Sequence, residues 1–285
     1  MDAGLFLKRV RDMFKLFLTG RIFKELIEVK SKMDANTKNW HKIFLTEKEQ
    51  PAKISVVIPT LNESDYIKNP ILSLKAGSYS NYEVIVVDCM SQDDTAETAR
   101  KLGAKVVLSK KRNVGYQTHL GFMSATGKII VRTDADTIFP QDTLIKIAET
   151  FEKERIAVYH VGHQYYDGDV LLNLLAHLYD KYWRRIWNTT GYFIAVRKSV
   201  YEKVVFKPLA KGQDYDFGKR AYEIFGHKAF AFDPGKAVLI SSRAVRKQGL
   251  IRYLVRQGSF RSRRTTLARK SPEIRGYSIA GRHKD

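Results

Sequence analysis

Two carboxylates separated by one residue follow a short apolar segment in the run Lys128-Ile-Ile-Val-Arg-Thr-Asp-Ala-Asp-Thr137. In an extended backbone residues i and i+2 point to the same side, so Asp134 and Asp136 can face one site together. Carboxylate oxygens at a strand end suit a hard divalent cation, Mg²⁺ or Mn²⁺, which leaves coordination places for phosphate oxygens. An Asp-x-Asp pattern alone also fits a solvated loop, so the surrounding segments must decide between the two interpretations.

Alternating strands and helices surround this pair from Pro51 onward. We expect strands at 54–59, 83–88, 105–108 and 129–132. We expect helices at about 65–76, up to about 103, and at about 115–125. Repeated βα units predict an α/β fold with a mainly parallel sheet and helices on both faces, and ligands bind such sheets beyond the carboxyl ends of the strands.

Polar residues stand at the carboxyl ends of three of these strands. The residues are Thr60, Asn62 and Glu63 after the first strand, Asp88 at the end of the second, and Asp134 and Asp136 after the fourth. All three sets fall at the same edge of a parallel sheet. This convergence favours a binding site over a solvated loop.

The ordered motifs resemble those of the inverting family 2 glycosyltransferases of GT-A fold, over roughly residues 53 to 245. Pro59-Thr-Leu-Asn-Glu63 is similar to the first-strand motif of that family, and Val87-Asp-Cys-Met-Ser-Gln-Asp-Asp-Thr95 to its Val-Asp-Asp-Gly-Ser-x-Asp-x-Thr. Arg112-Asn-Val-Gly115 and Ala125-Thr-Gly127 resemble the segment that leads into its Asp-x-Asp. The resemblance implies a UDP- or GDP-sugar donor.

The resemblance also implies roles for individual residues. Asp88 would contact the nucleotide base, and Asp134 and Asp136 would hold the ribose and the metal on the diphosphate. The expected donor-binding positions are Pro59, Thr60, Asn62, Glu63, Asp88, Arg112, Gly115, Asp134, Ala135 and Asp136. Cys89 and Met90 stand where Asp and Gly are usual in the family, so the nucleotide stays open. Cys89 is interpreted as a packed residue, since no adjacent base would activate its thiol.

The acceptor half is expected to follow Pro140. We expect a helix to about residue 154, a strand at 156–160, a half-buried helix from 171 to about 187, and closing strands at 228–232 and 237–241. Gly212-Gln-Asp214 resembles the Glu-Asp motif whose Asp is the catalytic base, with Gln213 replacing Glu. Asp214 at a helix start is also compatible with an N-cap. His160 and His163 are interpreted as structural histidines, with a metal-facing role as the alternative.

A net charge of +20 and a pI near 9.8 call for an anionic partner: nucleic acid, a membrane surface or phosphorylated substrates. From Ser241 to Asp285 there are thirteen basic residues and two acidic ones. In this tail Arg261 lies in a segment that loosely resembles the family's Gln-x-x-Arg-Trp, which would place it on the donor diphosphate. The alternative is a solvated or lipid-facing tail. The tail carries few aromatic side chains, which disfavours nucleic acid.

Apolar residues recur at intervals of three and four between Leu5 and Ile27, with basic residues between them, so residues 1–50 predict a basic amphipathic helical extension. Two interpretations stay open for it, an interfacial helix on an anionic membrane and a helix docked on the catalytic body, with a break at Gly20. The expected domains are 1–50, the catalytic domain 51–245 in halves 51–140 and 141–245, and the basic tail 246–285.

The single cysteine excludes an internal disulfide, and the sequence shows no membrane-spanning run and no signal peptide. We therefore expect a cytoplasmic protein, peripheral on the inner face of the membrane. The expected function is metal-dependent transfer of a sugar to a glycan or a polyprenyl lipid, with no nucleic-acid partner. The rivals are a basic nucleic-acid-binding protein and a catalytically idle sugar-nucleotide-binding subunit.

Overall fold

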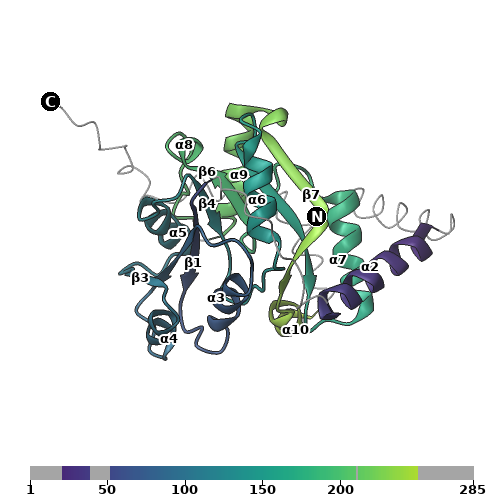
Figure 1. The fold of residues 1–285 in the computed structure, drawn as a ribbon, viewed down its shortest axis with the longest axis horizontal. Helices are drawn as coiled ribbons and strands as arrows, with labels where there is room; N and C mark the ends of the chain where they lie inside the picture. Colours follow the sequence, from purple (N-terminus) through teal and green to yellow (C-terminus); the bar gives the residue numbers. More distant parts are fainter. Residues whose placement is uncertain (1–20, 39–51, 210, 250–285) are drawn as a thin grey trace. The chain divides into compact units, whose positions relative to one another are not determined.

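A computed structural model describes residues 21–38, 52–209 and 211–249 of the 285-residue chain (Figure 1). The chain divides into two compact units, one formed by Phe23–Ser242 and one by Met1–Ile22 with Arg243–Asp285. The described part of the smaller unit contains the short helix α10 (Arg243–Gln248). Among the described residues, no helix has both the length and the apolar character needed to cross a bilayer.

The larger unit is built on a seven-stranded sheet with the order β3-β2-β1-β4-β6-β5-β7. The strands are β1 (Ile54–Thr60), β2 (Tyr82–Asp88), β3 (Lys105–Leu108), β4 (Ile129–Arg132), β5 (Val158–Tyr165), β6 (Ile194–Arg197) and β7 (Phe230–Ile240). The first four strands pair in parallel, β6 runs antiparallel to both β4 and β5, and β5 pairs in parallel with β7. The prediction of a mainly parallel α/β sheet is confirmed.

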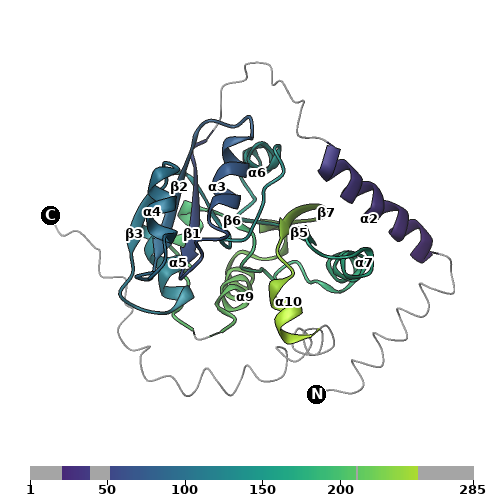
Figure 2. The ribbon, with the colours of Figure 1, turned by 90° about the horizontal axis from the view of Figure 1, so that it is seen from below.

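Helices cover both faces of this sheet, as predicted. Figure 2 shows α3 and α6 on one side of the sheet and α5 and α9 on the other. The helices are α2 (Arg21–Lys38), α3 (Lys68–Lys75), α4 (Thr95–Lys101), α5 (Val114–Met123), α6 (Thr143–Glu152), α7 (Val170–Leu178), α8 (Lys198–Tyr201) and α9 (Gln213–Phe225). A π-helical turn η1 (Tyr179–Trp183) extends α7, and a 3-10 turn η2 (His227–Ala229) precedes β7.

The central strands are buried from both sides, and most of their buried side chains are apolar. Val56, Val57 and Ile58 in β1 have no exposed surface, as expected of a strand inside a parallel sheet. On one face α5 approaches so closely that a Cβ atom on Gly121 would lie 2.3 Å from Cγ1 of Val57. This contact fixes the helix that begins beside the carboxyl end of β2.

The two closing strands predicted at 228–232 and 237–241 are one strand, β7, so the prediction of two was wrong. The pairing with β5 shifts register where Asp233 faces Val161 and Ala237 faces Gly162, which leaves Pro234–Lys236 as a bulge. Proline has no amide to donate, and Asp233 Oδ1 accepts instead from the amides of Gly235, at 2.9 Å, and Lys236.

Helix α2 packs beside α7 and η1 through a buried carboxylate (Figures 1 and 2). Glu25 is 5% exposed and accepts hydrogen bonds from Tyr182 at 2.6 Å and Lys181 at 3.0 Å, and it lies 2.6 Å from Nε2 of His177. These contacts therefore favour the interpretation in which residues 21–38 form a helix docked on the catalytic body. The helix starts directly after Gly20, and residues 1–20 lie outside the described part of the chain.

Candidate functional site

The carboxyl ends of β1, β2 and β4 lie at one edge of the sheet because these strands are parallel neighbours. Thr60 at the end of β1 pairs with Asp88 at the end of β2, and Arg132 at the end of β4 pairs with Val57. The backbone continues past β4 along β1, where the Thr133 amide donates to the Val57 carbonyl at 3.0 Å. The edge predicted from the sequence is therefore the edge at which the polar residues gather.

The loop after β1 is tied to the loop after β2 by side chains of the second motif. Asn62, whose φ is +54°, donates its amide to Ser91 Oγ at 2.9 Å and accepts from the Gln92 amide with its side chain. The Glu63 amide donates to Thr95 Oγ1 at 2.7 Å, and the next amide, that of Ser64, donates to the Asp93 carboxylate. These contacts give Asn62 and Glu63 fixed backbone positions, so their expected donor contacts would come from preformed loops.

Asp88 does not present its carboxylate to an open site, and this differs from the expectation that it contacts a nucleotide base. The side chain is 1% exposed, and its oxygens accept from Thr60 Oγ1 at 3.1 Å, from the Ser91 amide at 2.9 Å and from Ser91 Oγ at 2.5 Å. A carboxylate that is so fully engaged holds the turn after β2. Asp88 thus has a visible structural function in ordering this loop.

Cys89 and Met90 follow in that turn. Cys89 is buried, its Sγ lies 3.3 Å from the Lys111 carbonyl, and burial raises the pKa of the thiol, which agrees with the interpretation as a packed residue. Met90 is 65% exposed with φ of +53°. Glycine adopts this conformation without strain, so the methionine occupies a position for which the backbone favours the glycine usual in the resembling motif.

Arg112 and Gly115 lie at the start of α5, where Asn113 caps the helix by accepting from the Tyr116 amide at 2.9 Å. Arg112 is exposed and near enough to Cys89 to act on the pKa of its thiol. A Cβ on Gly115 would lie 2.3 Å from the Lys207 carbonyl oxygen, so close packing is sufficient reason for glycine there. Pro59 is partly buried within β1 and Ala135 is 3% exposed.

Asp134 and Asp214 meet the same guanidinium, that of Arg132. Nη2 of Arg132 lies 2.9 Å from Oδ1 of Asp134, and Nη1 lies 3.9 Å from Oδ1 of Asp214. Asp214 is the second residue of α9, whose N-cap is Gly212 with φ of +73°, so the N-cap interpretation of Asp214 was wrong. The two acids are eighty positions apart in the sequence, and one arginine joins them.

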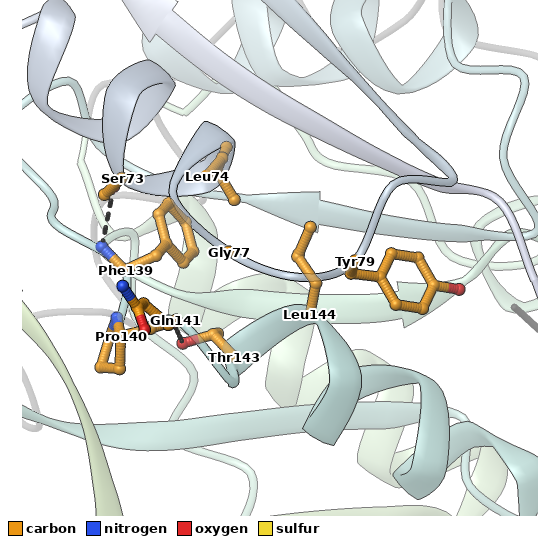
Figure 3. Close-up of a pocket in the computed structure, with 9 residues that line it drawn as sticks. All are labelled: Ser73, Leu74, Gly77, Tyr79, Phe139, Pro140, Gln141, Thr143 and Leu144. Atoms are coloured by element: carbon orange, nitrogen blue, oxygen red, sulfur yellow. Dashed lines mark hydrogen bonds between the residues drawn. The ribbon is translucent and has the colours of Figure 1, made fainter. Parts of the chain in front are cut away.

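The segment that carries Asp136 is held from two sides. Ile138 and Leu239 of β7 exchange backbone hydrogen bonds of 2.7 and 3.0 Å, and the Phe139 amide donates to Ser73 Oγ of α3 at 3.0 Å (Figure 3). In the close-up the Phe139 ring points toward Leu74, beneath the same helix. Asp136 itself is 8% exposed. Its backbone is therefore anchored by the core rather than by the loop alone.

Two residues near Asp136, Tyr166 and Asp167, were not predicted as site residues. Burial raises the pKa of Tyr166, a hydrogen bond with Ser241 lowers it, and the charges of Asp136 and Asp167 raise it further, so the phenol lies within electrostatic range of both acids. Asp167 accepts from Ser241 Oγ at 3.0 Å and from the Ser242 amide at 2.6 Å. Tyr166 and Asp167 follow β5 directly, and that position at a strand end is the signal from which they can be recognised.

The two histidines of β5 are structural, as interpreted. His160 lies 2.5 Å from the Ile186 carbonyl through Nε2, and burial, followed by the charge of Arg184, holds its pKa well below the usual 6.5. His163 lies 2.9 Å from the buried carboxylate of Asp180. Both side chains contact groups of the chain itself, which agrees with a structural function.

The donor set at the edge fits Mg²⁺ or Mn²⁺. It consists of carboxylate oxygens, which these ions prefer, and it leaves most coordination places to phosphate and water. Within the described ranges, the one cluster of three potential metal ligands is elsewhere, at Glu25, Glu28 and His177. There the ammonium of Lys181 already lies 3.0 Å from Glu25 and 3.2 Å from Glu28. Arg261, the last expected donor contact, lies outside the described residues.

Comparison with known proteins agrees with this arrangement. A mannosyltransferase of Pyrobaculum calidifontis, solved with GDP-mannose and Mn²⁺, superposes with a TM-score of 0.53 at 19% identity, over 86% of this chain and 74% of that one. Glucosyl-3-phosphoglycerate synthase of Mycobacterium tuberculosis, solved with Mn²⁺, UDP-glucose and phosphoglyceric acid, gives 0.54 at 22% identity, over 77% and 86%. These similarities establish the fold, that of the GT-A glycosyltransferases.

The family profile "Glycosyl transferase family 2" matches residues 55–208, more than half of the chain. The chain belongs to that family. A dolichol-phosphate mannosyltransferase of Pyrococcus furiosus is 28% identical over 177 residues, 55% of this chain and 49% of that protein. The chain spans about half the length of this relative, and 44% of the length of others that are 34% identical over 100 residues.

Asp93 joins the loop after β1 to the loop after β2 through its carboxylate. The pKa of Asp93 lies below its usual 3.8: burial acts to raise it, but hydrogen bonds from Thr95 and the Ser64 amide outweigh that effect. Its stabilisation is therefore present above pH 3.8 and disappears as the pH falls through the lowered folded-state pKa. We expect Asp93→Asn to lower the free energy of unfolding by roughly 1–2 kcal/mol at pH 7.

Urea denaturation at several pH values measures this difference, and Glu154→Gln, an exposed carboxylate after α6, serves as the control. The difference between wild type and Asp93→Asn should narrow below pH 3.8. A difference that stays constant down to pH 2.5 would mean that the ionised carboxylate is not what joins the loops.

Proposed function

We propose that this protein transfers a sugar from a nucleoside diphosphate sugar to an acceptor, with inversion at the anomeric carbon. The main support for this proposal is that Asp134 and Asp214 both form ion pairs with Arg132, at the edge where β1, β2 and β4 end. One acid belongs to the half that resembles a donor site and the other to the half that resembles an acceptor site. Transfer between two substrates requires such a junction.

In this mechanism Asp214 accepts the proton of the acceptor hydroxyl as its oxygen attacks the anomeric carbon. The carbon–oxygen bond to the diphosphate breaks on the opposite face, and the electron pair leaves with the diphosphate. Asp134 and Asp136 would hold Mg²⁺ or Mn²⁺, which when bound neutralises the charge that develops on the leaving group. Family membership and the Mn²⁺ in both structural neighbours support this metal.

The position of Asp214 supports its function as a base. It lies in the first turn of a thirteen-residue helix, where the helix dipole favours the ionised carboxylate. Its backbone carbonyl accepts a hydrogen bond of 2.5 Å from Thr189 Oγ1, and its Oδ2 accepts one from Gln213 Nε2 at 3.2 Å. These contacts fix both the backbone and the side chain of the acid.

The acceptor is proposed to be a glycan hydroxyl or a polyprenyl phosphate. The curated relative that acts on dolichol phosphate supports the lipid alternative. A phosphate acceptor is already anionic and needs no base, whereas a hydroxyl does. The two acceptor classes therefore make different demands on Asp214.

We expect Asp136→Ala to abolish turnover with either acceptor, a loss of at least about 10³-fold, because the leaving group loses its electrostatic stabilisation. Release of UDP or GDP from UDP-glucose or GDP-mannose in the presence of Mn²⁺ measures turnover. Glu154→Ala is the control, since this exposed side chain lies away from the edge. Full activity in a folded Asp136→Ala protein would defeat the metal assignment.

Asp214→Asn distinguishes the acceptor classes. With a hydroxyl acceptor we expect kcat to fall by about 10²–10⁴-fold, since the base is lost; with a phosphate acceptor kcat should stay nearly unchanged. Asp216→Asn is a matched control, because Asp216 lies in the same helical turn but pairs with Arg220 at 2.8 Å. Equal losses in the two variants would indicate damage to α9 rather than to a base.

We also propose that the protein works peripherally on the inner face of the membrane. The net charge of +20 and the thirteen basic residues after position 240 support attraction to anionic lipid. We expect cosedimentation with vesicles containing phosphatidylserine that weakens at high salt and after deletion of residues 250–285 or 1–20. Deletion of 1–20 spares α2. Binding that persists in the double deletion would place the attraction elsewhere.

A further inference from the structure

Arg132 occupies a position that the sequence gives little reason to single out. It is the last residue of β4, after three apolar residues, and it is 2% exposed. A guanidinium remains charged at every relevant pH, so the end of this strand contains a buried permanent cation. Burying such a charge is costly unless carboxylates compensate it, and the two that do so are Asp134 and Asp214.

The two ion pairs differ in geometry. The Nη2 contact with Asp134, at 2.9 Å, is a hydrogen-bonding distance, whereas the Nη1 contact with Asp214, at 3.9 Å, is a purely electrostatic one. Among the described residues, neither Nε nor Nη1 of Arg132 finds a hydrogen-bond partner. Arg132 therefore acts on Asp214 through charge, in a buried setting where water screens little.

The backbone of Gly191 packs directly against this guanidinium. A Cβ atom at position 191 would lie 1.7 Å from Nη1 and 2.6 Å from Cζ of Arg132. Any side chain there would displace the guanidinium from its present place. Gly191 is thus a second position from which the same arrangement can be disturbed while the arginine and its charge are kept.

The segment around Gly191 is held rigidly by its neighbours. Arg184 Nη2 donates to Thr190 Oγ1 at 3.1 Å, and Thr133 Oγ1 donates to the Tyr192 carbonyl at 2.8 Å. Two positions before Gly191, Thr189 donates to the backbone carbonyl of Asp214. One short segment, residues 189–192, therefore fixes both the position of the Arg132 guanidinium and the backbone of Asp214.

We infer that Arg132 is a positioning residue that couples the donor side of the site to the base. It holds Asp134 by a close ion pair, and its charge attracts Asp214 from the acceptor half. Arg132 does not itself touch substrate, because its guanidinium is enclosed by Asp134, Asp214 and Gly191. This inference rests on the proposed function of the two acids.

The experiment compares Arg132→Gln, Arg132→Lys and Gly191→Ala with wild type. Arg197→Gln is the matched control: Arg197 lies at the opposite end of the adjacent strand, opposite Ile129, and donates to the Phe151 carbonyl at 2.8 Å. For each protein a thermal melt verifies folding. Calorimetry then gives the Kd of the nucleoside diphosphate with Mn²⁺, and initial rates with UDP-glucose and GDP-mannose give kcat and KM.

We expect kcat to fall by about 10–100-fold in Arg132→Gln and Gly191→Ala, in the range usual for residues that orient a reacting group. The Kd of the nucleotide should change much less than kcat in both. Arg132→Lys, which retains a cation, should recover much of kcat, and Arg197→Gln should resemble wild type.

If the wild-type enzyme is active, two outcomes overturn the inference. In the first, Arg132→Gln and Gly191→Ala have the same kcat as Arg197→Gln. In the second, the Kd of the nucleotide rises by as large a factor as kcat falls. The second outcome would mean that Arg132 serves Asp134 alone. If Arg132→Gln does not melt cooperatively, Gly191→Ala decides, since it keeps the buried charge. A wild-type protein that turns over neither donor contradicts the proposed function instead, and the two failures are thereby distinguished.

Discussion

The buried cation at the end of β4 is the constraint on which the site depends. Arg132 is 2% exposed, and a buried guanidinium requires compensating carboxylates; the fold supplies them from the turn after β4 and from the first turn of α9. Each acid is one of the two carboxylates that face this cation. The compensation of this buried charge therefore uses the same pair of acids that sugar transfer would use.

The parallel sheet creates that juxtaposition at low conformational cost. Strands β1, β2 and β4 end at one edge, and backbone and side-chain hydrogen bonds hold the residues that follow them without the help of a ligand. Asp93 and Thr95 fasten the loop after β1, while Ser73 and Leu239 fasten the segment after Asp136. A site built from such anchored loops is preorganised, which is the condition for strong electrostatic stabilisation of a transition state.

Much of this edge was predictable from the sequence, because strand periodicity and the carboxyl-end rule need only local information. The positions of Asp134, Asp136 and Thr60 follow from those two arguments. Features that depend on long-range packing or on turn geometry were not predictable. Arg132 pairs with Asp214, Ser91 and Thr60 enclose the carboxylate of Asp88, and β7 continues through a bulge. In each case the deciding partner lies outside the motif or in a turn whose geometry the motif does not reveal.

Anomalous X-ray scattering from crystals grown with Mn²⁺ and a nucleoside diphosphate tests the central claim most directly. Our account predicts a manganese peak at the edge where β1, β2 and β4 end, coordinated by Asp136 or Asp134 and by the diphosphate. A peak at Glu25, Glu28 and His177 instead, or nucleotide density away from this edge, would contradict it.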